Sequence, residues 1–258
     1  MRLGRLFDQA SGRAYIVAID HGLALGAQPG NDHGLEIVER SLAGHPDGVL
    51  ISPGLLARSA RQFGHRGAAS AIVRTDFIAL DERLKHYGDL HRMLCTPREA
   101  AALGADAVIL YLVLGVDDGG TLADNVTAVA RTAAQAHKVG LPLIAEVVAW
   151  GSQAPDRRDA DLLTFGCRIA VEAGADAIKT EYTGDVESMR RLVEACPAPV
   201  MVLGGAKLES PDELYDVTRD ALRAGVSGVV YGRNIWQADD PVGMADAIRT
   251  IVHQDGGR

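Results

Sequence analysis

The sequence predicts one α/β domain over residues 1–258, folded as a TIM barrel of eight parallel strands with surrounding helices. Eight short apolar runs alternate with longer segments of helical spacing, and near-continuous apolar runs are typical of parallel strands buried on both faces. A glycine also closes helical segments just before the next run, as in the LGAD of residues 103–106 and the AGAD of residues 173–176. The alternative is a doubly wound open sheet, but no glycine-rich dinucleotide fingerprint follows the first run, where the chain continues DHGLALG.

Helix-start signals separate the apolar runs in order along the chain. Pro53 stands where a proline opens a helix, Thr96 and Glu99 have the spacing of a capping box, and Ser210 precedes a proline and two acids. The expected strands are residues 15–20, 48–52, 71–75, 107–114, 142–148, 177–179, 199–203 and 228–231. The expected helices include residues 32–43, 96–104, 122–139, 159–173, 186–195, 210–225 and 240–252.

Residues 76–93 form an irregular, charged stretch that is too long for an ordinary connection between strand and helix. We interpret it as a candidate functional loop, in which Lys85, His86, Tyr87 and His91 are the side chains that would cap a substrate. The alternative is a solvated loop without a role in the reaction.

Composition excludes several classes of partner. The formal net charge is −8 and no long basic block is present, which argues against nucleic acid or an anionic membrane as the main partner. No apolar run approaches the ~20 residues of a membrane span, and the N-terminus lacks the apolar centre of a signal peptide. The three cysteines form no CxxC pair, and His65, His137 and His253 have no ligand-like spacing. We therefore expect a cytoplasmic protein without a bound metal or cofactor.

The chemistry of a TIM barrel lies at the C-terminal ends of its strands. One of these ends carries Lys179, which either pairs with an acid such as Glu181 or Asp20 or acts as a nucleophile. The other side chains expected there are Asp20, His21, Arg74, Tyr111 and Glu146.

The turns after the seventh and eighth strands predict a phosphate site. Gly204, Gly205 and Gly232 allow close approach to backbone N–H groups, and TIM barrels often bind phosphate at these two turns. The cations expected to contribute charge there are Arg233, Lys207 and Arg74. A phosphate site beside a buried lysine indicates Schiff-base chemistry on a phosphorylated carbonyl compound, for which the amine must be neutral when it attacks.

Four motifs in this order resemble the class I aldolases of the DeoC/FbaB/LacD family. They are the DHG of residues 20–22, the AIKTEYTGD of residues 177–185, the GGAK of residues 204–207 and the GRNIWQ of residues 232–237. The likeness is strongest from residue 166 to residue 252. The resemblance implies a Schiff base at Lys179, an active-site aspartate at Asp20 and a phosphate cradle at Gly204, Gly205, Gly232 and Arg233. It also implies a homo-oligomer, in some members built of stacked rings.

The chain departs from the family pattern at one catalytic position. Archaeal-type fructose-bisphosphate aldolases and the related heptulosonate synthases end the fifth strand with a proton-transferring tyrosine, and Val148 stands there in this sequence. Two other inward positions offer a proton: Glu146, two residues earlier on the same strand face, and Tyr111 on the fourth strand. The structural alternatives are a salt bridge from Glu146, for example to Lys179, and a core tyrosine at Tyr111.

Three functions follow from these patterns. The first is an aldolase that uses Lys179 on a donor resembling dihydroxyacetone phosphate, with proton transfer by Asp20 and either Glu146 or Tyr111. The second is a thiolase-like acyl transfer from a phosphorylated diketone to coenzyme A, in which His21 matches a histidine of the family's autoinducer-processing thiolase. The third is a non-catalytic barrel that binds sugar phosphates.

Overall fold

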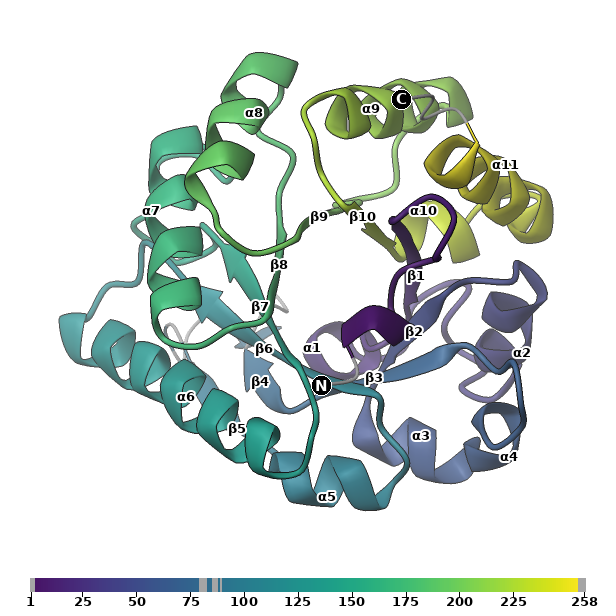
Figure 1. Ribbon diagram of the computed structural model, residues 1–258, viewed down its shortest axis with the longest axis horizontal. Helices are drawn as coiled ribbons and strands as arrows, with labels where there is room; N and C mark the ends of the chain where they lie inside the picture. Colours follow the sequence, from purple (N-terminus) through teal and green to yellow (C-terminus); the bar gives the residue numbers. More distant parts are fainter. Residues whose placement is uncertain (1–2, 79–82, 85–87, 89, 255–258) are drawn as a thin grey trace.

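The chain folds into a closed barrel of eight parallel strands, which confirms the predicted fold class (Figure 1). The computed structural model describes residues 3–78, 83–84, 88 and 90–254. Around the barrel the order is β1, β10, β9, β8, β7, β6, β3 and β2, so the last strand pairs with the first. These strands are β1 (Ala14–Ala18), β2 (Gly48–Ile51), β3 (Ser70–Arg74), β6 (Ala107–Val113), β7 (Leu143–Val148), β8 (Ala177–Thr180), β9 (Val200–Leu203) and β10 (Gly228–Tyr231).

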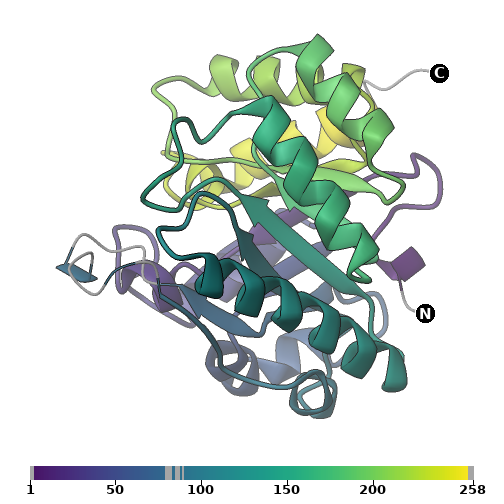
Figure 2. The ribbon, with the colours of Figure 1, turned by 90° about the vertical axis from the view of Figure 1, so that its left-hand side faces the viewer.

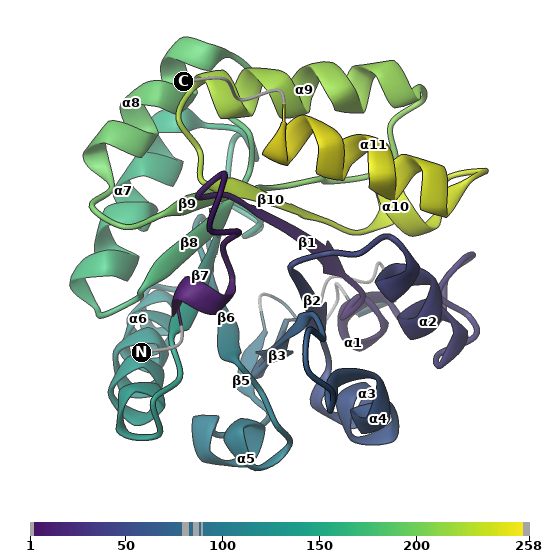
Figure 3. The same cartoon turned by 45° about the vertical axis from the view of Figure 1, so that its right-hand side comes forward.

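A ring of helices covers the outside of the barrel (Figures 1 and 3). The helices that begin at Pro53, Pro97 and Pro211 start as predicted, because the side chain of the preceding serine or threonine accepts a hydrogen bond from a backbone N–H of the first turn. The helical elements are η1 (Leu3–Arg5), α1 (Gly22–Leu25), α2 (Glu36–Ala43), α3 (Pro53–Arg58), α4 (Ala60–Phe63), α5 (Pro97–Ala102), α6 (Gly119–Lys138), α7 (Ala160–Glu172), α8 (Val186–Ala195), α9 (Pro211–Arg223), α10 (Arg233–Trp236) and α11 (Pro241–His253). None of the helices in the described ranges combines the length and apolar character that crossing a bilayer requires.

The N-terminal half of the barrel interior is apolar. Ile16, Leu50, Ile72, Ile109 and Ile144 belong to one buried cluster in which branched side chains fill the barrel. Leu6, which follows η1, packs into the same cluster. The side view in Figure 2 shows the N-terminal segment at one end of the barrel. This end is therefore sealed by packing, and a pocket can form only at the opposite end of the strands.

The interior becomes polar one layer closer to the C-terminal ends of the strands. Tyr111 is in register with Glu146 on β7, and Glu146 is in register with Lys179 on β8. Residues in register on neighbouring parallel strands point to the same side of the sheet. These three side chains therefore enter the barrel at one level, two residues above the apolar layer that contains Ile109 and Ile144.

Residues 76–93 differ from the irregular loop expected from the sequence. The two ends of the stretch pair as an antiparallel ribbon, β4 (Asp76–Ile78) with β5 (His91–Met93). Asp76 pairs with Met93 and Ile78 pairs with His91, so the ribbon holds the side chains of Asp76 and His91 beside the barrel. Lys85, His86 and Tyr87, which we expected to cap a substrate, lie outside the described residues.

Candidate active site

A pocket opens at the C-terminal end of the barrel, where the motifs predicted to act together converge. Its walls come from the ends of β1, β6, β7, β8, β9 and β10 and the turns that follow them. The predicted residues that line it are Asp20, His21, Tyr111, Glu146, Lys179, Gly204, Gly205, Gly232 and Arg233. The structure thus brings together nine of the residues predicted from the sequence, and leaves out Arg74 and Lys207.

Lys179 lies at the floor of this pocket in an ion pair with Glu146. Its Nζ is 2.6 Å from Glu146 Oε1, and the two residues are 5% and 1% exposed. The partner acid within the described residues is therefore Glu146, rather than Glu181 or Asp20. The salt bridge considered for Glu146 exists, and its geometry also places a carboxylate oxygen where it can exchange a proton with the lysine amine.

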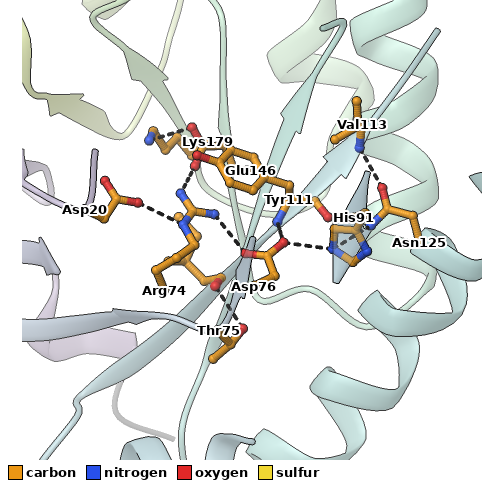
Figure 4. A network of polar contacts seen from close by, with 11 residues as sticks. Asp20, Arg74, Thr75, Asp76, His91, Tyr111, Val113, Asn125, Glu146 and Lys179 are labelled. Atoms are coloured by element: carbon orange, nitrogen blue, oxygen red, sulfur yellow. Dashed lines mark hydrogen bonds and ion pairs between the residues drawn. The ribbon is translucent and has the colours of Figure 1, made fainter. Parts of the chain in front are cut away.

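Arg74 is buried behind this pair and contacts three carboxylates (Figure 4). Its Nε donates to Asp20 Oδ2 at 2.8 Å, its Nη1 faces Asp76 Oδ1 at 3.4 Å and its Nη2 donates to Glu146 Oε2. The prediction of Arg74 as a phosphate ligand is wrong, because the residue is 1% exposed and every arm of the guanidinium already holds an acid.

The charged groups in this cluster shift one another's pKa values. Burial opposes ionisation of Asp20, but the Arg74 guanidinium and Lys179 outweigh burial and hold the pKa of Asp20 below its ordinary value. Burial also tends to lower the pKa of Arg74, whereas Tyr111, Glu146 and Asp20 raise it well above the usual arginine value. Asp20 is therefore a carboxylate and Arg74 a cation throughout the neutral pH range.

Tyr111 covers Arg74 with the face of its ring. The guanidinium carbon is 3.8 Å from the ring centroid, a short cation–π contact. Burial raises the pKa of the Tyr111 hydroxyl well above 10, so the phenol is protonated at neutral pH. Since Tyr111 also lines the pocket, it stays a candidate proton donor.

His21 follows Asp20 and forms the pocket wall opposite Glu146. Burial lowers the pKa of His21 to about 4, so its imidazole is neutral at physiological pH. Its Nδ1 is buried, and no described group forms a hydrogen bond with it; Asp20 Oδ1 is 3.7 Å away. A neutral ring can accept a proton from substrate but is a poor acid.

The turns after β9 and β10 are held together by one asparagine. Asn234 Nδ2 donates to the carbonyls of Gly204 and Ala206 at 2.8 and 3.0 Å, and its Oδ1 accepts from Leu208 N. A Cβ at Gly232 would lie 2.4 Å from His21 Cε1, so only glycine fits this position without a shift of the histidine. Both glycine turns therefore present backbone to the pocket, as a phosphate cradle requires.

The two cations predicted to bind phosphate, Arg233 and Lys207, lie in different surroundings. Arg233 is half-buried in the pocket, and its Nε is a buried donor without a hydrogen-bond partner among the described residues. Lys207 is not at the pocket: its Nζ donates to the Gln237 carbonyl at 2.7 Å, and the residue lines a separate surface depression beside α9. Lys207 thus lies outside the pocket lining, and its role as a phosphate ligand stays a prediction from the sequence.

Val148 occupies the position of the missing tyrosine and supplies no proton. It is fully buried and packs in a small apolar cluster with Ile78, Tyr111 and Leu203. On β6 and β7, the groups that can exchange a proton with a substrate in this pocket are consequently Tyr111 and Glu146.

The sequence reasoning missed Trp150 and Arg157 on the β7–α7 connection. Trp150 lines the pocket and donates from Nε1 to Glu181 Oε1 at 2.9 Å, and the Arg157 guanidinium lies 5.8 Å from the Trp150 ring centroid. The signal for Trp150 was its place two residues beyond the end of a strand. Nothing in the sequence pattern distinguishes Arg157 from its neighbour Arg158. In the described part of the chain, no three histidine, cysteine or acidic side chains gather as a metal site.

Comparison with known proteins identifies the family. The sequence model of the DeoC/LacD family aldolases matches residues 14–238. An uncharacterised aldolase of Saccharolobus solfataricus is 33% identical, with 99% of this chain and 94% of that protein covered. The 2-amino-3,7-dideoxy-D-threo-hept-6-ulosonate synthase of Halobacterium salinarum is 34% identical, with 98% of this chain and 91% of that protein covered.

Solved structures agree with the sequence comparison. An archaeal fructose 1,6-bisphosphate aldolase superimposes with a TM-score of 0.86 at 27% identity, covering 99% of this chain and 98% of that one. A second archaeal structure, in which the catalytic lysine carries the carbinolamine intermediate of the substrate, has a TM-score of 0.86 at 26% identity and covers 98% of both chains. From the barrel, the lysine at the floor of its pocket and these matches, we conclude that the chain belongs to the DeoC/LacD family of class I, Schiff-base aldolases.

Proposed function

We propose that this aldolase makes or breaks a carbon–carbon bond in a phosphorylated ketose, with Lys179 as the Schiff-base nucleophile and Glu146 as the proton-transfer group. The observation that carries the proposal is the 2.6 Å contact between Lys179 Nζ and Glu146 Oε1 on the floor of a pocket that opens onto two glycine turns. The amine and the carboxylate share one wall, so a carbonyl carbon that reaches the amine also comes within reach of the carboxylate.

The reaction follows from this geometry. Glu146 takes a proton from the Lys179 ammonium, and the free amine adds to the substrate carbonyl to give a carbinolamine. Loss of water from the carbinolamine leaves an iminium. In the cleavage direction Glu146, which has returned its proton to the departing water, then removes the proton of the hydroxyl on the far carbon of the bond that breaks. The bonding electrons move to the iminium and form an enamine, and an aldehyde leaves. Protonation of the enamine carbon and hydrolysis release the second product and restore Lys179.

The phosphate of the donor fits the side of the pocket formed by β9 and β10. Gly204, Gly205 and Gly232 present backbone there, and the unpartnered Nε of Arg233 points to an anionic ligand. These two strands follow β8 in the barrel order, so a donor whose carbonyl carbon meets Lys179 would extend its phosphate towards them. A ligand resembling dihydroxyacetone phosphate has this length and charge.

Borohydride trapping tests the proposal. The chain contains four lysines, Lys85, Lys138, Lys179 and Lys207, so peptide mass spectrometry can assign an adduct without ambiguity. With dihydroxyacetone phosphate and borohydride we expect one reduced adduct, on Lys179, and cleavage of phosphorylated ketoses that is independent of coenzyme A. An adduct on another lysine would refute the assignment of Lys179, and turnover that requires coenzyme A would instead favour the thiolase-like reaction.

The side of the pocket that would hold the aldehyde acceptor carries positive charge, whereas acids surround Lys179 at the floor. β7 lies on the opposite side of β8 from β9, so the part of a ketose beyond the iminium would run towards Trp150 and the β7–α7 connection. Arg157 lies over the Trp150 ring, and it helps burial to lower the pKa of Arg233. Neither arginine forms an ion pair within the described ranges, in a chain whose net charge is −8. This local excess of positive charge favours an aldehyde acceptor that carries a phosphate or carboxylate.

Replacement of Arg157 by alanine tests the charge of the acceptor. We expect KM to rise about tenfold for phosphorylated or carboxylated aldehydes, because one charge-assisted contact worth about 1.5 kcal/mol is lost. Uncharged aldehydes should be unaffected. Arg66→Ala is the matched control, since Arg66 is an exposed arginine that precedes β3 and so lies at the other end of the barrel. Equal effects of the two substitutions, or an equal rise in KM for uncharged aldehydes, would argue against a role for Arg157 in recognising charge.

Homo-oligomeric assembly and a cytoplasmic location stay predictions from the sequence and the family resemblance.

A further inference from the structure

We propose that Arg74 is a positioning residue that sets the orientation of both pocket carboxylates, Asp20 and Glu146, relative to Lys179. This inference rests on the proposed function and deepens it. It replaces the phosphate-binding role that the sequence predicted for Arg74, and it accounts for the way this chain works with Val148 in the place of the family tyrosine.

The first step of the argument is geometric. Arg74 starts one layer below the reaction centre, in register with Ile109, and its side chain rises to the level of Glu146. Nη2 holds Glu146 Oε2, which leaves Oε1 facing Lys179. Nε holds Asp20 Oδ2, which leaves Oδ1 on the side of His21. One rigid guanidinium therefore decides which oxygen of each acid faces the pocket.

The second step concerns charge. Three buried carboxylates, Asp20, Asp76 and Glu146, surround two cations, Arg74 and Lys179. When Lys179 gives up its proton to attack a carbonyl, Arg74 is the cation that remains among these five groups. Without Arg74, the acids would hold the lysine ammonium more strongly, and they would repel one another. A buried guanidinium, which does not lose its proton, keeps one positive charge beside these acids through the whole cycle.

The third step is that Arg74 is itself held in place from behind. Asp76 accepts from Tyr111 N at 2.7 Å and contacts His91 Nε2 at 3.0 Å, and the Tyr111 ring covers the guanidinium. Asn125 on α6 donates to the Tyr111 carbonyl at 2.7 Å and accepts from Val113 N. Figure 4 shows this chain of contacts running from Lys179 to α6. The β4–β5 ribbon supplies both Asp76 and His91, and neither lines the pocket, so these two side chains support the reaction centre from behind.

Two substitutions of Arg74 test the inference. Arg74→Lys keeps the charge but cannot hold two acids in a fixed plane, and Arg74→Gln removes the charge as well. We expect kcat to fall about 30-fold or more in Arg74→Lys and further in Arg74→Gln, with KM for the phosphorylated donor changing less than about threefold. Because Arg74 holds the pKa of Asp20 down, its loss should also move the acidic limb of the kcat/KM profile to higher pH in Arg74→Gln.

The controls separate positioning from folding and from the proposed function. Arg13→Lys alters another arginine, whose partly buried guanidinium donates to the Val252 carbonyl, and should leave kcat unchanged. If Arg74→Gln does not fold, Arg74→Lys and Asp76→Asn carry the test, and Asp76→Asn should lower kcat several-fold by loosening Arg74. A rise in KM with unchanged kcat in Arg74→Lys would overturn the inference. Absence of any Lys179 adduct in the unmodified protein would instead overturn the proposed function.

Discussion

Replacement of Lys179 by arginine should abolish aldol cleavage while leaving the barrel folded. An arginine retains the positive charge opposite Glu146 but cannot form an iminium, because its guanidinium is not a nucleophilic amine at neutral pH. Loss of a covalent nucleophile typically lowers kcat by about 10⁴-fold or more. We expect cleavage of a phosphorylated ketose to fall to the background rate and the borohydride adduct to disappear.

The measurement needs two comparisons. Lys179→Met removes the charge as well and leaves Arg74 to compensate Asp20, Asp76 and Glu146 without the lysine. It should therefore also lower stability, by about 3 kcal/mol, the usual cost of leaving buried charge uncompensated. Lys138→Met changes an exposed lysine at the end of α6 and should behave like the unmodified protein in every assay. Residual turnover in Lys179→Arg above about 1% of the original rate would show that another group is the nucleophile.

The sequence was sufficient to predict the barrel because its signals are local. Each strand is a short apolar run, and the capping box of Thr96 and Glu99 forms as the spacing predicts, with both side chains bonded to backbone N–H groups. The β4–β5 ribbon was not predictable in this way. Its strands are three residues long, and twelve residues separate Ile78 from His91, so pairing depends on where β3 ends and on the side chains it meets.

The sequence predicted which residues form the site better than it predicted the contacts between them. Strand ends placed Lys179, Glu146 and Tyr111 near one another, but their common level depends on the register of β6, β7 and β8, which no local pattern encodes. Arg74 illustrates the limit. An arginine at a strand end suggested an anionic ligand, and the anions proved to be three acids, of which Asp20 and Glu146 are distant in sequence and Asp76 is two residues away.

Replacement of Glu146 by glutamine should separate Schiff-base formation from carbon–carbon cleavage. Both oxygens of Glu146 accept a hydrogen bond, one from Lys179 and one from Arg74, whereas an amide offers only one accepting oxygen. One of the two donors therefore loses its partner, at a cost of about 1–3 kcal/mol in stability. Because general acid–base catalysis contributes about 10²–10⁴-fold, kcat should fall within that range.

The decisive comparison is with Tyr111→Phe, which keeps the ring over Arg74 and removes only the hydroxyl. If Glu146 transfers the proton at cleavage, Glu146→Gln should still yield a borohydride adduct on Lys179, formed more slowly because the ammonium must lose its proton to water, and should release aldehyde slowly. Tyr111→Phe should retain most of the cleavage rate. Glu172→Gln, on the surface of α7, is the control for loss of a carboxylate. The opposite result, with cleavage lost in Tyr111→Phe and kept in Glu146→Gln, would transfer the acid–base role to the tyrosine. In that case Glu146 would serve only as the counter-ion of Lys179. The valine at position 148 makes this comparison necessary, because the chain must move a proton without the tyrosine that the family resemblance implies at this position.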